Sequence, residues 1–122
     1  MTARQLSVFR STLERELADV HELEVRLRAE IRASLESRRS TTTDEAEDPE
    51  GSSLAFEGAQ TTSMLRHTTM HANEMIAAIG RIDDGSFGTC AACGGAIAPG
   101  RLEARPSAEL CIVCAAKRPI AD

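Results

Sequence analysis

The sequence Cys90-Ala91-Ala92-Cys93 is followed, after seventeen intervening residues, by Cys111-Ile112-Val113-Cys114. Two Cys-x-x-Cys pairs at this separation are typical of a tetrathiolate zinc site, because two intervening residues let one short turn direct both sulfurs toward a common ion. Gly94-Gly95 follows the first pair, where the backbone must turn back with positive φ, and Pro99-Gly100 predicts a further turn. We therefore expect a small, loop-rich knob that holds one structural Zn²⁺ through Cys90, Cys93, Cys111 and Cys114.

Two other uses of the four cysteines remain open from the sequence. Disulfides persist mainly in oxidising compartments, and the first residues run into a charged amphipathic stretch without the apolar segment of a secretory signal. A Cys-x-x-Cys pair can also be redox-active, but no βαβ pattern surrounds either pair, which weakens a thioredoxin-like interpretation. A catalytic zinc keeps an open coordination position. Because four thiolates close the shell, a structural ion is favoured.

The first forty residues predict one long helix. Their apolar residues recur at steps of mostly three or four, and neither Gly nor Pro interrupts them. A helix of this kind cannot bury its apolar stripe alone and needs a partner helix. The stripe consists of Leu6, Phe9, Leu13, Leu17, Val20, Leu23, Leu27, Ile31 and Leu35.

A second helical pattern extends from about Ser53 to Asp83, and Asp84-Gly85 ends it. Pro49 and Gly51 predict a turn between the two patterns. Because the two helices have similar lengths and a short connection, we expect them to pack as an antiparallel hairpin. The second stripe is weaker and contains small residues that permit close approach, namely Ala55, Ala59, Thr62, Leu65, Thr69, Ala72, Ile76, Ile79 and Ile82.

The predicted fold class is mostly α: a long antiparallel helical hairpin (coiled coil) with an appended small four-cysteine zinc-finger knob. We expect residues 1–84 to form the hairpin with an acidic tip at about 40–53, residues 85–116 to form the zinc finger, and residues 117–122 to form a C-terminal tail. A segment of about 30 residues is too small to fold on apolar burial alone. Zinc binding is therefore expected to supply the missing stability.

The acidic composition argues against direct DNA binding. The formal net charge is −5 and the chain has no Trp or Tyr, whereas nucleic-acid affinity depends on a basic face and on aromatic stacking. No run of eighteen apolar residues is present, so no transmembrane helix is expected. We expect a cytoplasmic, monomeric protein with no sequence-specific DNA binding and no membrane partner.

The segment between Ser40 and Gly58 contains six acids and no base. One interpretation is a solvated loop whose charge maintains solubility. The other is a probe that presents carboxylates to a cation, a basic surface or a metal site in a partner. Paired carboxylates also serve acid–base catalysis, but so thin a turn offers no enclosing pocket, and no enzymatic activity is expected. The acids are Asp44, Glu45, Glu47, Asp48, Glu50 and Glu57.

Three segments frame the cysteines, with Ile97 between them: Asp84-Gly85-Ser86-Phe87-Gly88-Thr89-Cys90-Ala91-Ala92-Cys93-Gly94, Arg101-Leu102-Glu103-Ala104-Arg105-Pro106 and Leu110-Cys111-Ile112-Val113-Cys114. Together they resemble the DksA/TraR zinc-finger family. The resemblance implies a bacterial regulator of transcription initiation that binds RNA polymerase rather than promoter DNA. It also implies that the zinc knob rests at the rim of the secondary channel, while the coiled coil brings its acidic tip near the active centre.

The family's tip has the pattern Asp-x-x-Asp-x-Ala. Counting back from Cys90 without gaps places Glu47, Glu50 and Ser52 on this pattern. A shift of one residue instead aligns Asp48-Pro49 with the family's Asp-Pro and places Gly51 on the second acid. The implied tip contacts are therefore Glu47, Asp48 and Glu50.

Arg105 matches one of the basic residues through which family members bind the alarmone ppGpp jointly with polymerase, and it is the implied partner contact of the zinc knob. Glu74 and Ala115 stand where lysines are expected. An acid at such a position repels a polyphosphate. We therefore expect a weak response to ppGpp, or none.

Two rival functions remain open. One is a coiled-coil adaptor, stapled by zinc, that joins other proteins without acting on transcription. The other is a thiol and zinc redox switch, in which oxidation releases the metal and unfolds the knob.

Overall fold

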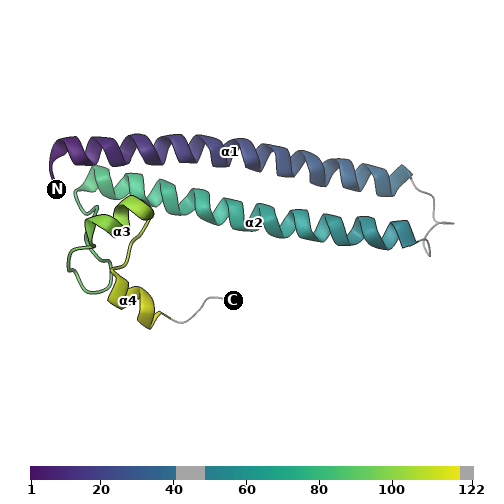
Figure 1. The fold of residues 1–122 in the computed structure, drawn as a ribbon. Helices are drawn as coiled ribbons and strands as arrows, with labels where there is room; N and C mark the ends of the chain where they lie inside the picture. Colours follow the sequence, from purple (N-terminus) through teal and green to yellow (C-terminus); the bar gives the residue numbers. More distant parts are fainter. Residues whose placement is uncertain (41–48, 119–122) are drawn as a thin grey trace. The chain divides into compact units, whose positions relative to one another are not determined.

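The computed structural model describes residues 1–40 and 49–118, with side chains for residues 1–39 and 55–118. In these residues it contains α1 (Ala3–Ser40), α2 (Pro49–Asp84), α3 (Pro99–Ala104) and α4 (Ile112–Lys117), which Figure 1 follows along the chain. The chain divides into two compact units. The first unit comprises Met1–Leu17 and Asn73–Asp122, and the second comprises Ala18–Ala72.

In the first unit, the beginning of α1 lies against the end of α2 and the cysteine-rich segment. The ring centroids of Phe9 and Phe87 are 5.2 Å apart, and the Arg10 guanidinium pairs with the Asp83 carboxylate. The cysteine-rich segment therefore shares one core with the two helix ends. The buried apolar side chains of this unit are Leu13, Met75, Ala78, Phe87, Cys90, Ile97, Leu102 and Ala108.

In the second unit, α1 and α2 run antiparallel. Thr69 Oγ1 donates to Glu24 Oε2 over 2.9 Å, and a Cβ on Gly58 would lie 3.4 Å from Oγ of Ser34. The later residue of α1, Ser34, thus lies beside the earlier residue of α2, Gly58, as an antiparallel pair requires. Glu24 is only 7% exposed. Because a buried carboxylate is costly without partners, the Thr69 hydroxyl and the nearby guanidinium of Arg28 stabilise it.

The predicted fold class is confirmed, with differences at the ends of α2. This helix begins at Pro49, so the turn predicted at Pro49 and Gly51 is wrong. Proline suits a first helical position, because its missing N–H has no intrahelical acceptor there and its φ is already helical. At the other end, Gly85 adopts a φ of 85° directly after Asp84 and ends the helix as predicted.

The predicted stripe of α1 is confirmed over most of its length, since its members from Leu6 to Ile31 are buried or half-buried. Leu35 is the exception, at 47% exposed. In α2 the predicted stripe is partly wrong. Ile76 is 49% exposed, and Ala55, Ala59 and Thr62 are exposed as well. Met75 and Ala78, which the predicted stripe omits, are fully buried.

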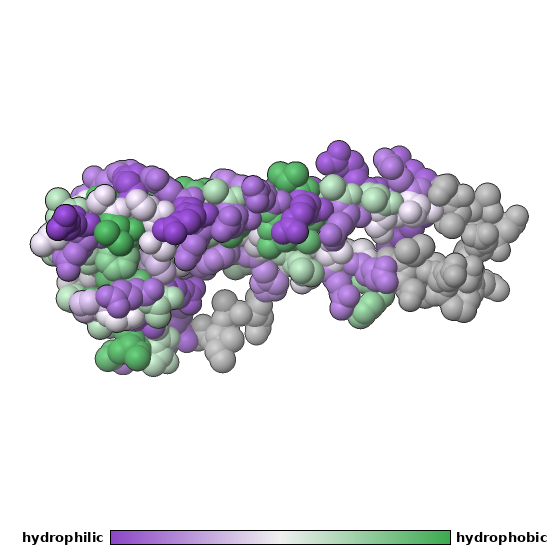
Figure 2. All heavy atoms as spheres, turned by 45° about the horizontal axis from the view of Figure 1, so that its top comes forward, coloured by the Kyte–Doolittle hydropathy of each residue, from purple (hydrophilic) through white to green (hydrophobic). Residues whose placement is uncertain are grey.

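On the face drawn in Figure 2, hydrophilic side chains predominate and hydrophobic ones form separate small groups. Within the described residues, no helix combines the length and apolarity that crossing a bilayer requires.

Candidate metal centre

The first cysteine pair lies in a short hairpin. Thr89 and Ala96 form an isolated antiparallel bridge, and the Cys90 N–H donates to the Gly95 carbonyl over 2.7 Å. Cys93 lies in the turn that this bridge closes. The hairpin thus carries both sulfurs of the pair.

Gly94 provides the reversal after this pair. Its φ of 75° lies in the left-handed region, as predicted, and its N–H donates to the Cys90 carbonyl over 2.9 Å. The same expectation for Gly95 is wrong, because its φ is not positive. Gly95 instead directs its N–H to Cys93 Sγ at 3.4 Å.

The second cysteine pair lies at the start of α4. Cys111 is the N-cap residue, and its Sγ accepts from the Cys114 N–H at 3.5 Å. The Cys111 carbonyl also accepts from the Ala115 N–H over 2.9 Å. The first turn of α4 therefore places both sulfurs on the same side of the chain.

All four Sγ atoms lie within 4.8 Å of one another. The Cys93 and Cys111 sulfurs are 3.9 Å apart, close to the roughly 3.8 Å separation expected for thiolates about 2.3 Å from a tetrahedral zinc. A disulfide requires an S–S distance of about 2.05 Å, and all four cysteines are free. These residues form the predicted four-cysteine site for one structural Zn²⁺.

The pKa values of the thiols in this cluster differ when no cation is bound. Backbone N–H groups of Cys111 and Cys93 donate to Cys90 and lower its pKa to about 6. The Cys114 N–H lowers the pKa of Cys111. Side-chain hydrogen bonds to Cys111, Cys90 and Cys93 raise the pKa of Cys114 to about 12. Four adjacent thiolates therefore require a compensating charge, which Zn²⁺ supplies when bound.

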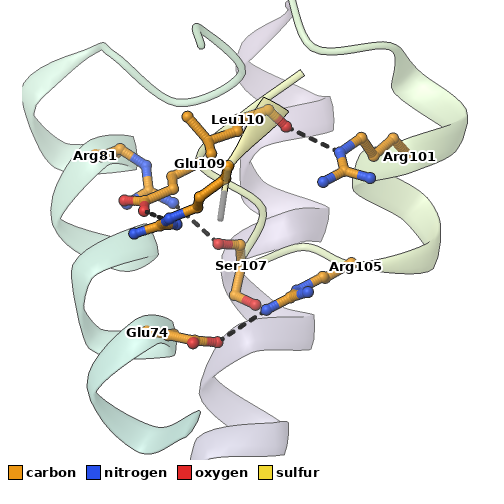
Figure 3. A network of polar contacts seen from close by, with 8 residues as sticks. Glu74, Arg81, Arg101, Arg105, Ser107, Glu109 and Leu110 are labelled. Atoms are coloured by element: carbon orange, nitrogen blue, oxygen red, sulfur yellow. Dashed lines mark hydrogen bonds and ion pairs between the residues drawn. The ribbon is translucent and has the colours of Figure 1, made fainter. Parts of the chain in front are cut away.

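The segment between the cysteine pairs is held by hydrogen bonds that no sequence motif indicated (Figure 3). Arg81 of α2 donates through Nη2 to the Ser107 carbonyl over 3.3 Å, and Arg101 of α3 donates through Nε to the Leu110 carbonyl over 2.9 Å. The predicted turn at Pro99-Gly100 is instead the start of α3. Leu102 of α3 is fully buried and anchors this helix in the core of the first unit.

Arg105 lies on the surface of the first unit and pairs with Glu74 of α2. Its Nη2 is 3.2 Å from Glu74 Oε2, and both side chains are substantially exposed (Figure 3). The structure thus pairs Arg105 and Glu74, two residues that the family resemblance placed at positions for binding ppGpp. An exposed ion pair contributes little to stability, but it neutralises the guanidinium locally.

The structure does not bring the predicted tip residues into a described site. Glu47 and Asp48 lie outside the described residues, as do Asp44 and Glu45. Glu50 belongs to the first turn of α2, and the described side chains begin after it.

Comparisons with known proteins agree with this geometry. Residues 85–119 match the model of the prokaryotic dksA/traR C4-type zinc finger. The structure of transcription factor DksA2 from Pseudomonas aeruginosa is similar with a TM-score of 0.72 and 23% sequence identity, covering 94% of this chain and 83% of that chain. A search of curated proteins finds no match. The predicted resemblance is therefore confirmed: residues 85–119 carry a zinc finger of the dksA/traR C4 type, within a chain that shares its fold with DksA2.

Proposed function

We propose that this protein is a bacterial transcription regulator that binds RNA polymerase through its secondary channel and modulates initiation. The observation that carries the proposal is the combination of a dksA/traR C4-type zinc finger with a fold shared with transcription factor DksA2 over 94% of this chain. The paired α1 and α2 would enter the channel, and the zinc finger with Arg105 would contact its rim. The protein would act as a cytoplasmic monomer, without enzymatic activity or DNA binding of its own.

The acidic segment is the proposed acting part. We expect Glu47→Ala/Glu50→Ala to bind polymerase core as tightly as the unmodified protein while losing most of its effect on transcription, because the carboxylates act at the active centre rather than in docking. Binding is measured by fluorescence anisotropy with zinc-loaded protein, and the effect by promoter transcription in vitro. Glu22→Ala/Glu30→Ala, which removes two exposed acids from α1, is the matched control and should retain the effect.

The same experiment separates this proposal from an adaptor. Failure of the unmodified protein to bind polymerase would overturn the transcriptional function and favour the zinc-stapled adaptor. Binding with equal effects of both double variants would retain polymerase as the partner but contradict a role for the tip acids.

We propose further that the regulator responds weakly or not at all to ppGpp. Arg105 already pairs with Glu74 over 3.2 Å, and Glu74 would repel the alarmone's phosphates. We expect the transcriptional effect to be equal with and without ppGpp, and Arg105→Ala to leave this equality unchanged. Transcription across a ppGpp titration measures it. Strong synergy with ppGpp would contradict the proposal, and its loss in Arg105→Ala would assign the alarmone contact to Arg105.

A further inference from the structure

A groove of about 950 Å³ lies between the first turns of α1 and the zinc finger, and all of its lining residues belong to the first unit. Val8 and Phe9 of α1 and Pro99 of α3 line it, together with Phe87 and Ile97, whose side chains also belong to the buried core of the first unit. Val8 is 61% exposed. A concave surface with an accessible apolar wall of this kind is typical of a binding site.

The second feature of the groove is an unpaired backbone edge at Ala96, which lines it. The bridge between Thr89 and Ala96 is closed by flanking bonds, one of which runs from the Ile97 N–H to the Gly88 carbonyl over 2.8 Å. In such a bridge the bridging residues point their own N–H and C=O groups away from the partner strand. Among residues 1–40 and 49–118, neither group of Ala96 has a hydrogen-bond partner. An extended chain can pair with such an edge.

The third feature is a pair of opposite charges. Arg4 of α1 and Glu103 of α3 both line the groove, and neither forms an ion pair within the described part of the chain. A polyanion such as RNA would meet the Glu103 carboxylate, and an acyl chain would satisfy neither charge. A peptide that carries both an acid and a base complements the two residues.

We propose that this groove binds an extended segment of a partner protein by β-strand addition. The segment's backbone pairs with Ala96, an apolar side chain contacts Val8 and Phe9, and an acidic and a basic side chain meet Arg4 and Glu103. The site uses neither the acidic segment nor Arg105, so it goes beyond the proposed effect on transcription.

The test begins with a random peptide library displayed on phage and selected against the full-length, zinc-loaded protein. Enriched peptides should combine an apolar residue with an acid and a base, and Val8→Glu should weaken their binding by about tenfold or more, a loss of about 1.4 kcal/mol. Val25→Glu is the matched control, because Val25 lies on the same helix with a similar exposure of 65% but outside the groove. Isothermal titration calorimetry with the synthetic peptides measures both variants.

Two further measurements test the mode of binding. Hydrogen exchange at the Ala96 amide should slow when the peptide is bound, and N-methylation of the pairing peptide amide should abolish binding. Arg4→Glu should weaken binding, and exchanging the peptide's acid for a base should restore it.

Several outcomes would overturn the proposal. These are an absence of enriched peptides, equal binding by Val8→Glu and the unmodified protein, or unchanged exchange at Ala96 in the complex. Self-association in sedimentation velocity that Val8→Glu abolishes would also overturn it, because the occupant would then be a second copy of the chain.

Discussion

Cys90→Ser is expected to abolish stoichiometric zinc binding and to unfold the zinc finger while most of α1 remains helical. Cys90 is 2% exposed, and its backbone groups also close the hairpin through Gly95 and Gly94. Structural zinc contributes apparent binding free energies of about 10–16 kcal/mol in small zinc peptides, far more than the few buried side chains of this segment can replace. Zinc content is measured by mass spectrometry of the metal, and local unfolding by amide hydrogen exchange.

Thr89→Ser is the control for this change, because it alters the adjacent exposed residue and retains all four sulfurs. It should bind one equivalent of zinc and protect the finger's amides normally. One bound zinc in Cys90→Ser, with protection retained at Phe87, Ile97 and Leu102, would contradict the structural role.

Zinc affinity of the unmodified protein should fall as the pH is lowered, since protons compete with the metal for the thiolates.

Leu13→Ala is expected to lower the free energy of unfolding by about 2–5 kcal/mol, the range for a buried leucine that leaves a cavity. Leu13 is fully buried in the first unit, whose core also contains the fully buried Met75 and Ala78. Truncation to alanine therefore removes packing contacts in the core and leaves a cavity that solvent does not fill. Urea denaturation of the zinc-loaded protein, followed by helical circular dichroism, measures the change.

Leu35→Ala provides the comparison, because the sequence assigns Leu35 to the same apolar stripe of α1. Its side chain is 47% exposed, and surface substitutions typically change stability by only about 0.5 kcal/mol. Equal loss of unfolding free energy in the two variants would contradict the difference in burial between Leu13 and Leu35.

Local features of this protein follow directly from its sequence. The run of apolar residues from Leu6 to Ile31 specifies a helix because its spacing matches the helical period without reference to any other segment. The cysteine spacing predicts the metal site for a similar reason, since each pair needs only one short turn. Gly94 adopts the positive φ predicted for it, and Gly85 ends α2 as predicted, because access to the left-handed region belongs to the glycine residue itself.

The spacing of apolar residues did not determine which face of α2 is buried. Its stripe contains threonines and alanines, so the contrast between its faces is weak, and Ile76 was predicted to lie inward in place of Met75. Packing against the rest of the first unit decides the rotation of the helix, and it buries Met75 and Ala78. The start of α2 at Pro49 was missed because proline is compatible with both a turn and a first helical position.

By itself, the sequence determined the long helices, the four-cysteine metal site and the resemblance to a zinc-finger family, because each depends on short-range spacing along the chain. Only the tertiary structure decided the pairing of Arg105 with Glu74, the hydrogen bonds from Arg81 and Arg101, and the groove beside Ala96. The Arg105–Glu74 pair and the Arg81–Ser107 bond join residues 31 and 26 positions apart, and no short-range pattern indicates them or the bond from Arg101. Their geometry arises only when the helix ends and the zinc finger pack around one core.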